Sequence, residues 1–295
     1  MMSEPFLLPP RTLVSGEKSL KISRPILMGI LNPTPDSFSD GSSFFEFDNA
    51  LTQARKIIHE GAEWLDIGGE PSGPGSSEVS LEEELRRVIP IVKAVRSESD
   101  IWISVDTCKA EVARRSLDAG ADAVNDVSAL RADKEMASVI YEYQVPVVLM
   151  YSKDLATHTS TNNAEYRDVM QTIVSFFKER LKYAEKSGIR KNQIIIDPGM
   201  GFFISGNEKY SFEVIRRISE LHEFDLPLLL GPSRKSFLSG VSRGRFLNFS
   251  ERDFPCALVS SIALWQGISA LRFHEVKQGR LLIDTFENLK NSSTA

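Results

Sequence analysis

The chain has 295 residues, of which 42% are hydrophobic and 25% are charged, and its formal net charge is −5. This composition is typical of a globular protein and excludes a long disordered chain. The negative net charge excludes a general attraction to nucleic acid or to an anionic membrane, so an anionic substrate would need a local cationic site. Cys108 and Cys256 lie far apart without metal-ligand spacing, which predicts reduced thiols in a cytoplasmic protein.

The two ends of the chain show no pattern of a membrane segment or a targeting signal. No apolar run approaches the ~18 residues of a membrane-spanning helix. The amino-terminal FLLPP is too short and too proline-broken for the apolar part of a signal peptide. We therefore expect no membrane partner, and we expect peripheral segments at 1–21 and 291–295 around a single domain over 22–290.

Short apolar runs, most of them flanked by glycine or proline, recur along this domain. Several are rich in β-branched residues, which is typical of parallel strands that are covered on both faces. The predicted strands are 25–31, 64–68, 101–106, 122–127, 146–150, 194–199, 227–231 and 270–274.

Amphipathic stretches between these strands predict helices at 47–63, 80–98, 108–121, 163–188 and 254–267. Gly61 is a suitable residue to end the first, Ser80 with Glu83 forms a capping box at the start of the second, and the last is apolar and predicted to be buried. Eight strands alternating with helices predict an α/β fold, the (β/α)8 TIM barrel, as a single domain. A doubly wound open sheet is the alternative, but no G-x-G-x-x-G turn follows the first strand.

Polar side chains follow seven of the eight predicted strands. In a barrel, all of these strand ends lie on one rim, where barrel active sites are built. Capping of the following helix explains single cases, such as Asp106 or Asp126, but not the whole set. The residues at the strand ends are Asn32, Asp66, Asp106, Asn125, Asp126, Asp197, the run Ser233 to Ser236, Arg272 and His274.

The residues on this rim are of two chemical kinds. Asp106, Asn125 and Asp197 can accept hydrogen bonds from the flat amino-amidine edge of a heterocycle such as a pterin or guanine, and a buried carboxylate needs such a partner. The cations Arg234, Lys235 and Arg272, with His274, suit phosphate groups. The rim is therefore predicted to bind a donor-rich heterocycle and a polyphosphate together.

Eight segments together resemble, in order, those of the dihydropteroate synthases, and the resemblance covers about residues 25–290. This family has a TIM-barrel fold and is usually homodimeric. The resemblance implies a Mg²⁺-dependent transferase of folate biosynthesis that joins 6-hydroxymethyl-7,8-dihydropterin pyrophosphate to p-aminobenzoate, and a target for sulfonamides. The segments are ILMGILNPTPDSFSDG, WLDIGGEPSGPGS, ISVDT, AVNDVSA, VVLM, IIIDPGMGF, LLLGPSRKSFL and LRFHEV.

The resemblance also implies roles for individual residues. Asp106, Asn125, Asp197 and Lys235 would bind the pterin. Asn32, Arg272 and His274 would bind pyrophosphate, with Asn32 as the Mg²⁺ ligand. Phe38 and Asp40 belong to a first loop, Ser72 and Pro74 to a second, and Phe202 and Ser236 to the p-aminobenzoate end. The catalytic residues would be Lys235, Asp106, Arg272 and His274, without a covalent nucleophile or an assigned general base.

The sequence departs from the family pattern near the second substrate. Gly73 stands where arginine is usual, and Phe203-Ile204 replace a frequent Gly-Lys pair. DPGMGFF resembles the sulfonamide-insensitive branch of the family, so we hypothesise that sulfonamides are tolerated. Two alternatives to the synthase are a pterin-binding paralogue without this activity and a pterin-dependent methyltransferase, which would have no need of the SRKSF segment.

Overall fold

A computed structural model describes residues 9–33, 43–155, 158–241 and 246–292. Eight parallel strands form one sheet in the order β8-β7-β6-β5-β4-β3-β10-β9. A parallel bridge between Ile196 and Leu228 joins the two ends of this order, so the sheet closes on itself. The predicted (β/α)8 barrel is confirmed, and each predicted strand contains one of the eight: β3 Ile26–Leu31, β4 Trp64–Gly68, β5 Trp102–Asp106, β6 Ala123–Asp126, β7 Val147–Met150, β8 Ile194–Asp197, β9 Leu229–Leu230 and β10 Ala270–Phe273.

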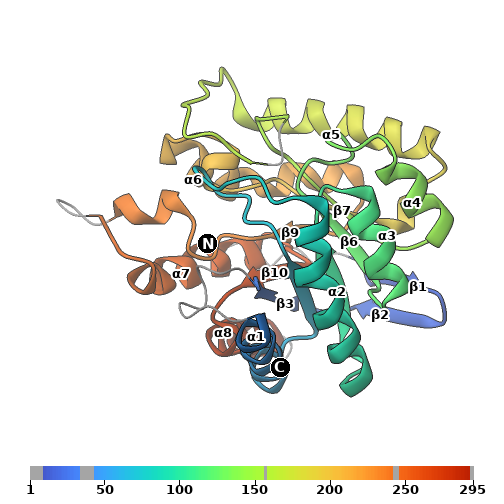
Figure 1. The fold of residues 1–295 in the computed structure, drawn as a ribbon. Helices are drawn as coiled ribbons and strands as arrows, with labels where there is room; N and C mark the ends of the chain where they lie inside the picture. Colours follow the sequence, from blue (N-terminus) through green and yellow to red (C-terminus); the bar gives the residue numbers. More distant parts are fainter. Residues whose placement is uncertain (1–8, 34–42, 156–157, 242–245, 293–295) are drawn as a thin grey trace.

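Helices surround the barrel (Figure 1). The Ser80 hydroxyl accepts a hydrogen bond from the Glu83 amide at 3.2 Å, as expected for a helix that begins there. The predicted 163–188 helix starts later, because the Asp168 carboxylate accepts from the Gln171 amide and caps it. The helices are α1 Ser43–His59, α2 Leu81–Glu98, α3 Ala110–Asp118, α4 Met136–Tyr143, α5 Val169–Lys186, α6 Glu208–Arg217, α7 Asp253–Trp265 and α8 Val276–Asn291. None of the helices in the described ranges is long and apolar enough to cross a membrane.

The prediction that 254–267 is buried is wrong for one face of α7. Cys256, Val259 and Leu264 are buried, but Phe254 and Leu258 are 79% and 56% exposed. An apolar composition does not tell which residues of a helix face the barrel, because that depends on how the helix docks. The exposed residues of α7 therefore form an apolar surface without a covering element in the described residues.

The segment before the barrel contains two strands that the sequence analysis did not predict. The strands β1 Arg11–Ser15 and β2 Lys18–Ile22 pair as an antiparallel hairpin. Leu13 from this hairpin is buried in the same apolar cluster as Trp64 and Trp102. Both tryptophans lie at the start of their strands, so the hairpin closes the amino-terminal end of the barrel.

Strand alternation sets which side chains enter the barrel. On β4, Trp64 and Asp66 point inward while Leu65 and Ile67 belong to the core shared with the helices. On β5, Trp102 and Ser104 alternate in the same way, and the parallel register pairs Trp64 with Trp102 and Asp66 with Ser104. The interior is therefore layered, with an apolar floor below and a polar layer above it toward the carboxyl ends of the strands.

Candidate active site

A cavity of about 710 Å³ lies at the carboxyl ends of the barrel strands. It receives side chains from the ends of β3, β5, β9 and β10 and from the loop that follows β4. Among the predicted site residues, it is lined by Asn32, Ser72, Asp106, Lys235, Arg272 and His274. Residues far apart in the sequence, such as Asn32 and His274, which are separated by 242 positions, therefore share one cavity wall.

Arg272 lies at the centre of the polar layer. Its Nε atom donates to Asp66 Oδ2 at 2.7 Å, and its Nη2 atom donates to Asp106 Oδ2 at 2.7 Å. Asn125 Nδ2 donates to the same Asp66 oxygen at 3.0 Å, and the Ser104 hydroxyl donates to the other. Since unpaired buried charges are costly, the guanidinium and the two carboxylates stabilise one another inside the barrel.

Asp197 lies beside this network. A Cβ atom added at Gly231 would lie 3.7 Å from Arg272 Cβ and 4.0 Å from Asp197 Oδ2, so the two side chains are neighbours. Asp197 Oδ1 accepts from the Gly199 amide at 2.8 Å. Burial raises the pKa of Asp197 to about 6, although this hydrogen bond and Lys235 oppose the shift. Oδ2 thus remains an acceptor that a bound heterocycle can use.

Lys235 completes the wall above Asp197. Burial and the charge of Arg272 lower the pKa of Lys235 to about 8, with Asp197 and Asp106 acting in the opposite direction. The Lys235 Nζ atom lies 4.4 Å from the centre of the Phe203 ring. A cation over an aromatic face is held electrostatically, so Phe203 helps to orient this ammonium group.

Asp106 is the one carboxylate of the Arg272 bridge that lines the cavity. Burial raises its pKa, and the neighbouring Asp66 carboxylate adds to this effect, whereas the Arg272 guanidinium lowers it. Two buried carboxylates around one guanidinium compete for its charge. Asp106 can therefore exchange its partner when a charged or donor-rich ligand enters.

His274 occupies the outer edge of the same wall. Its Nδ1 atom lies 3.0 Å from the Ser233 hydroxyl. Burial, followed by the charges of Arg272, Arg234 and Lys235, lowers the pKa of His274 to about 3. The imidazole is therefore neutral near pH 7 in the free protein, and it can serve an anion as an N–H donor but not as a fixed charge.

Arg234, which the sequence analysis counted among the cations of the rim, is held elsewhere. Its backbone lies in the left-handed region, with φ of 58°. Its guanidinium pairs with Glu275 and lies 3.7 Å from Asp253. These carboxylates neutralise Arg234, so Lys235 and Arg272 carry more of the positive charge that faces the cavity.

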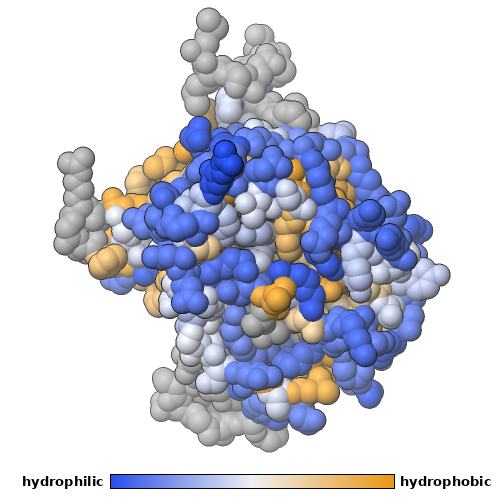
Figure 2. All heavy atoms as spheres, turned by 90° about the horizontal axis from the view of Figure 1, so that it is seen from above, coloured by the Kyte–Doolittle hydropathy of each residue, from blue (hydrophilic) through white to orange (hydrophobic). Residues whose placement is uncertain are grey.

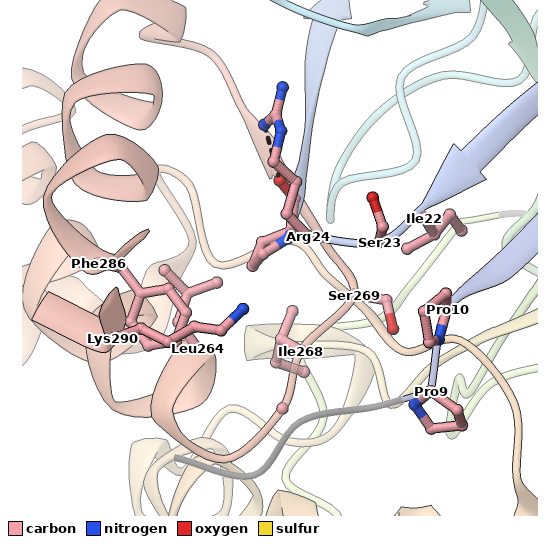
Figure 3. A pocket seen from close by; sticks show the side chains of 12 residues that line it. Pro9, Pro10, Ile22, Ser23, Arg24, Leu264, Ile268, Ser269, Phe286 and Lys290 are labelled. Atoms are coloured by element: carbon pink, nitrogen blue, oxygen red, sulfur yellow. Dashed lines mark hydrogen bonds between the residues drawn. The ribbon is translucent and has the colours of Figure 1, made fainter. Parts of the chain in front are cut away.

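A second cavity, of about 320 Å³, lies at the opposite end of the barrel (Figure 3). Pro9 and Pro10 border it on one side, and Phe286 borders it on the other. Arg24, which also borders this cavity, donates a hydrogen bond from Nη2 to Glu63 Oε1 at 2.6 Å. No cluster of buried acids and bases surrounds this cavity among the described residues, in contrast to the cavity at the carboxyl-terminal rim.

The comparisons with known proteins agree with this geometry. A protein-family model described as "Pterin binding enzyme" matches residues 28–274. The dihydropteroate synthase of Escherichia coli K12 is 40% identical over 262 residues, which cover 88% of this chain and 90% of that protein. The chain belongs to the dihydropteroate synthase family.

Other members support the same assignment. The dihydropteroate synthase of Synechocystis is 40% identical over 257 residues, which cover 86% of each chain. A solved structure of Xanthomonas albilineans dihydropteroate synthase with 4-aminobenzoic acid superimposes with a TM-score of 0.87 at 34% identity, over 97% of this chain and 100% of that one. The Yersinia pestis enzyme, solved with a sulfonamide drug, has a TM-score of 0.87 at 36% identity.

Asp66 is the main member of the network to which the sequence analysis gave no role. The sequence signal was present, because a carboxylate in a strand covered on both faces is buried whichever way it points and so needs a partner. Asp66 is 0% exposed. Its partner Arg272 is 206 residues away, and this pairing cannot be read from the chain.

Of the described residues predicted for the second substrate, Ser72 lines the cavity, whereas Pro74, Phe202 and Ser236 do not. Ser72 and Pro74 are half-buried in the second loop, and Glu70 anchors this loop by accepting from the Val79 amide at 3.1 Å and pairing with Lys109. Phe202 and Ser236 are also half-buried. A Cβ atom at Gly201, whose φ is 64°, would lie 3.0 Å from Ser236 Oγ, so the loops after β8 and β9 touch. Phe38 and Asp40 of the first loop lie outside the described residues.

Proposed function

We infer that this barrel is a dihydropteroate synthase, which transfers the pterinylmethyl group of 6-hydroxymethyl-7,8-dihydropterin pyrophosphate to p-aminobenzoate and releases pyrophosphate. The observation that supports this most is the Arg272 bridge between Asp66 and Asp106, with Asp197 and Lys235 alongside. It combines acceptors for a donor-rich heterocycle with cations for an anion. We propose that the domain over 22–290 carries this activity in the cytoplasm, where the two buried free cysteines would stay reduced.

The pterin is proposed to lie on the polar layer. Asp197 would accept two parallel N–H bonds from the amino-amidine edge, and Asn125 and Asp106 would bind other polar atoms of the ring. Lys235 would donate to a ring acceptor from the side. Each of these groups is already oriented by a neighbour, such as the Gly199 amide for Asp197, so little side-chain freedom is lost on binding.

The pyrophosphate is proposed to bind at the outer edge of the cavity. A guanidinium has five N–H donors. Arg272 directs one of them, on Nε, to Asp66 and another, on Nη2, to Asp106, so the remaining N–H groups can bind the anion. The neutral His274 adds an N–H donor. As pyrophosphate charge develops, these donors strengthen their bonds, which is the property that accelerates a reaction.

A magnesium ion fits this end of the cavity. A Cβ atom at Gly68 would lie 3.3 Å from Asn32 Oδ1 and 3.2 Å from Asp106 Cβ, so an amide oxygen and a carboxylate side chain adjoin there. Among the described residues no group of three His, Cys, Asp or Glu side chains forms a complete metal cage. Mg²⁺ binds readily through one or two protein oxygens plus substrate phosphates and water. When bound, it would neutralise charge on the leaving pyrophosphate, with Asn32 as the proposed ligand.

The reaction can proceed without a covalent enzyme intermediate. The bond between the exocyclic methylene carbon and the pyrophosphate oxygen breaks, and the leaving pyrophosphate takes the electron pair. Asp106 and its neighbours stabilise the cation that remains on the pterin. The amine nitrogen of p-aminobenzoate then forms the new bond to this carbon and loses one proton to solvent. Phe202, Ser72, Pro74 and Ser236 are proposed to place the amine, and Phe38 and Asp40 stay predictions from the sequence.

Pyrophosphate release by the purified protein tests this function. With both substrates and Mg²⁺, we expect one pyrophosphate and one dihydropteroate per turnover, and growth of a strain that lacks its own synthase. Gly73, which lines the cavity without a side chain where the family usually has arginine, favours one alternative, a pterin-binding paralogue. Retained pterin binding without pyrophosphate release, under conditions in which the E. coli enzyme turns over, would establish that alternative.

A homodimer is proposed through the exposed face of α7 and the neighbouring α8. Phe254, Leu258 and Ile262 follow one another at helical spacing and are 79%, 56% and 48% exposed, and Leu281 and Leu289 of α8 are exposed as well. Hydrophobic residues reach the surface at the left edge of Figure 2, the side on which α7 lies in Figure 1, whereas the rest of that view is mostly hydrophilic. A helical apolar surface of this kind is typical of subunit interfaces.

Replacement of Leu258 by Asp is expected to weaken self-association by at least about tenfold, because a charge would be buried in the interface. Sedimentation over a concentration series measures this. Val14→Asp is the control, since Val14 is 48% exposed on the hairpin at the amino-terminal end of the barrel, away from α7. A dimer of unchanged affinity in Leu258→Asp would rule out this surface.

Tolerance of sulfonamides is the prediction attached to Phe203. Its ring is buried against Lys235, in the loop that holds the p-aminobenzoate end. We expect purified protein to need more than about tenfold more sulfonamide for half inhibition than the E. coli enzyme, since one altered pocket contact can have this effect. Phe203→Gly should restore sensitivity. Equal inhibition of both enzymes would refute the hypothesis.

A further inference from the structure

The loop that follows β7 contains a buried cation outside the cavity. The Lys153 side chain is 7% exposed. Its ammonium group contacts Asp154 at 2.7 Å, Thr159 Oγ1 at 3.0 Å, and the carbonyl oxygens of Ser160 and Phe202 at 2.8 Å each. An ammonium group has three protons. Lys153 therefore uses its full donor capacity inside the protein.

The segment after β7 also donates hydrogen bonds to two other loops, the one after β8 and the second loop, which contains Ser72. The Lys153 amide donates to the Phe203 carbonyl at 2.8 Å, and the Thr159 hydroxyl donates to the Phe202 carbonyl at 2.9 Å. The Thr159 amide donates to the Ser72 carbonyl at 3.2 Å. The loop after β8 is thus bound by the ammonium group itself, and the second loop is bound by the backbone of Thr159, whose hydroxyl contacts the same ammonium group.

The hydrogen bonds to the loop after β8 fix the backbone of two aromatic residues, Phe202 and Phe203, near the proposed p-aminobenzoate site. Phe202 is half-buried, and the Phe203 ring lies 4.4 Å from the Lys235 ammonium. A shift of the Phe202 and Phe203 backbone would move both rings, and with them the wall at the p-aminobenzoate end. A shift of Ser72 would move the facing loop. Asp197 and Asn125, by contrast, are held by Gly199 and Asp66.

We propose that Lys153 is a positioning residue for p-aminobenzoate, which acts by holding the Phe202 carbonyl through its ammonium group, together with the Thr159 hydroxyl that binds the same carbonyl. The Phe203 and Ser72 carbonyls are bound by the backbone amides of residues 153 and 159, which a side-chain substitution keeps. Lys153 does not line the cavity and need not touch either substrate. Charge-assisted hydrogen bonds are shorter and stronger than neutral ones, so a lysine suits a brace that must keep the Phe202 carbonyl in place. This proposal rests on the synthase activity inferred above.

Kinetics of Lys153→Met and Thr159→Val test the proposal. For Lys153→Met we expect the KM for p-aminobenzoate to rise about tenfold, and for Thr159→Val about threefold, because the charged brace is lost in the first and only a hydroxyl in the second. The KM for the pterin pyrophosphate should stay within about twofold in both, since Asp197 and Asn125 are held by Gly199 and Asp66, and the backbone bond to the Phe203 carbonyl remains in both variants. Thr159→Val keeps the shape of its side chain and remains informative if Lys153→Met does not fold.

Arg180→Met is the matched control. Arg180 is also a buried cation that donates to loop carbonyls, at 2.9 Å to Ala129 and 3.3 Å to Leu130, but that loop follows β6. We expect a loss of thermal stability without a selective rise in the KM for p-aminobenzoate. An equal rise in both KM values for the Lys153 and Thr159 variants, or the same selective rise in Arg180→Met, would overturn the proposal.

Binding of p-aminobenzoate in the presence of hydroxymethylpterin and pyrophosphate, measured by calorimetry, separates this proposal from the proposed function. If the unsubstituted protein binds p-aminobenzoate but does not release pyrophosphate, the synthase assignment fails while the affinity ratio of the variants still tests Lys153. If p-aminobenzoate does not bind to the unsubstituted protein at all, both are overturned. Unchanged affinity in both variants would overturn the positioning role alone.

Discussion

Asp197→Asn is expected to lower pterin affinity by about two orders of magnitude and, at the same time, to raise the thermal stability of the protein. An amide in place of a carboxylate presents a donor to the donor-rich edge of the pterin and loses a charged acceptor, and each such loss costs about 1–3 kcal/mol. The Asn side chain can still accept from the Gly199 amide through Oδ1. Calorimetric binding of 6-hydroxymethylpterin and the midpoint of thermal unfolding measure the two effects.

The sign of the stability change follows from the pKa of Asp197. Burial raises this pKa from 3.8 to about 6, so the folded state binds a proton more tightly than the unfolded chain. Between pH 3.8 and pH 6 the contribution of Asp197 to the free energy of unfolding therefore falls as the pH rises, and above this window the ionised carboxylate destabilises the fold. Asn removes that cost, since it does not ionise.

The same pKa predicts a pH dependence of binding. Pterin affinity of the unsubstituted protein should fall as the pH is lowered through about 6, because the Asp197 carboxylate becomes protonated. Asp197→Asn should lose the part of this pH dependence that comes from Asp197, whereas the part that comes from Asp106, whose pKa burial also raises, should remain. A variant that binds the pterin as tightly as the unsubstituted protein at pH 7.5 would exclude Asp197 as the paired acceptor.

Asp126→Asn is the matched control for stability. Asp126 also ends a strand and is 0% exposed, but its carboxylate accepts from the Ser128 amide and hydroxyl and from the Leu130 amide. Burial raises the pKa of Asp126 as well, but an amide nitrogen at this position would face an N–H donor and forfeit accepted hydrogen bonds. We therefore expect lower stability, opposite to the change for Asp197→Asn. The two carboxylates are alike in burial and differ in whether the protein itself fills their acceptor sites.

Arg272→Met is expected to abolish detectable turnover, with a loss of at least about a thousandfold, and to destabilise the fold by about 3–5 kcal/mol. The stability loss arises because Asp66 and Asp106 would remain buried without their cation. The activity loss arises because the anion site loses its fixed charge. Urea unfolding and pyrophosphate release measure the two quantities.

The double variant Asp66→Asn with Arg272→Met separates these causes. Removing one of the two carboxylates should recover part of the stability, since less charge stays unpaired, but it should recover no activity. In Arg272→Met, the dissociation constant for the pterin pyrophosphate should rise much more than the dissociation constant for hydroxymethylpterin without pyrophosphate. Equal weakening of both ligands would reject the role of Arg272 in anion binding.

Arg217→Met provides the surface comparison for Arg272. Arg217 contacts three carboxylates, those of Asp168, Glu213 and Glu220, at 2.6–3.0 Å on the outside of the barrel. Ion pairs near solvent typically contribute about 0–1 kcal/mol, because water replaces the lost partner. We expect a small change in stability and full activity. The contrast would show that burial, more than the number of carboxylates, sets the cost of losing the cation.

Much of this architecture follows from local sequence. The strands were predictable because short β-branched runs bounded by glycine and proline have few other conformations that bury both faces. The position of Asp106, Asn125, Asp197 and Arg272 on one rim followed from the fold class alone, since parallel barrel strands end on the same side. The roles of these residues toward substrates stay predictions, and the experiments above test them.

The barrel, the family and the set of polar residues at the strand ends could therefore be predicted from the chain alone. The folded structure was needed to show which of these residues pair, as in the bridge from Arg272 to Asp66 and Asp106. It was also needed to show that His274 is neutral and that Glu275 neutralises Arg234. It also decided that the hairpin of residues 11–22 closes the barrel, that one face of α7 is exposed, and that Lys153 is buried. The physical reason is that periodicity and strand ends are local properties of the chain, whereas ion pairing, burial and pKa depend on neighbours that folding brings from distant parts of the sequence.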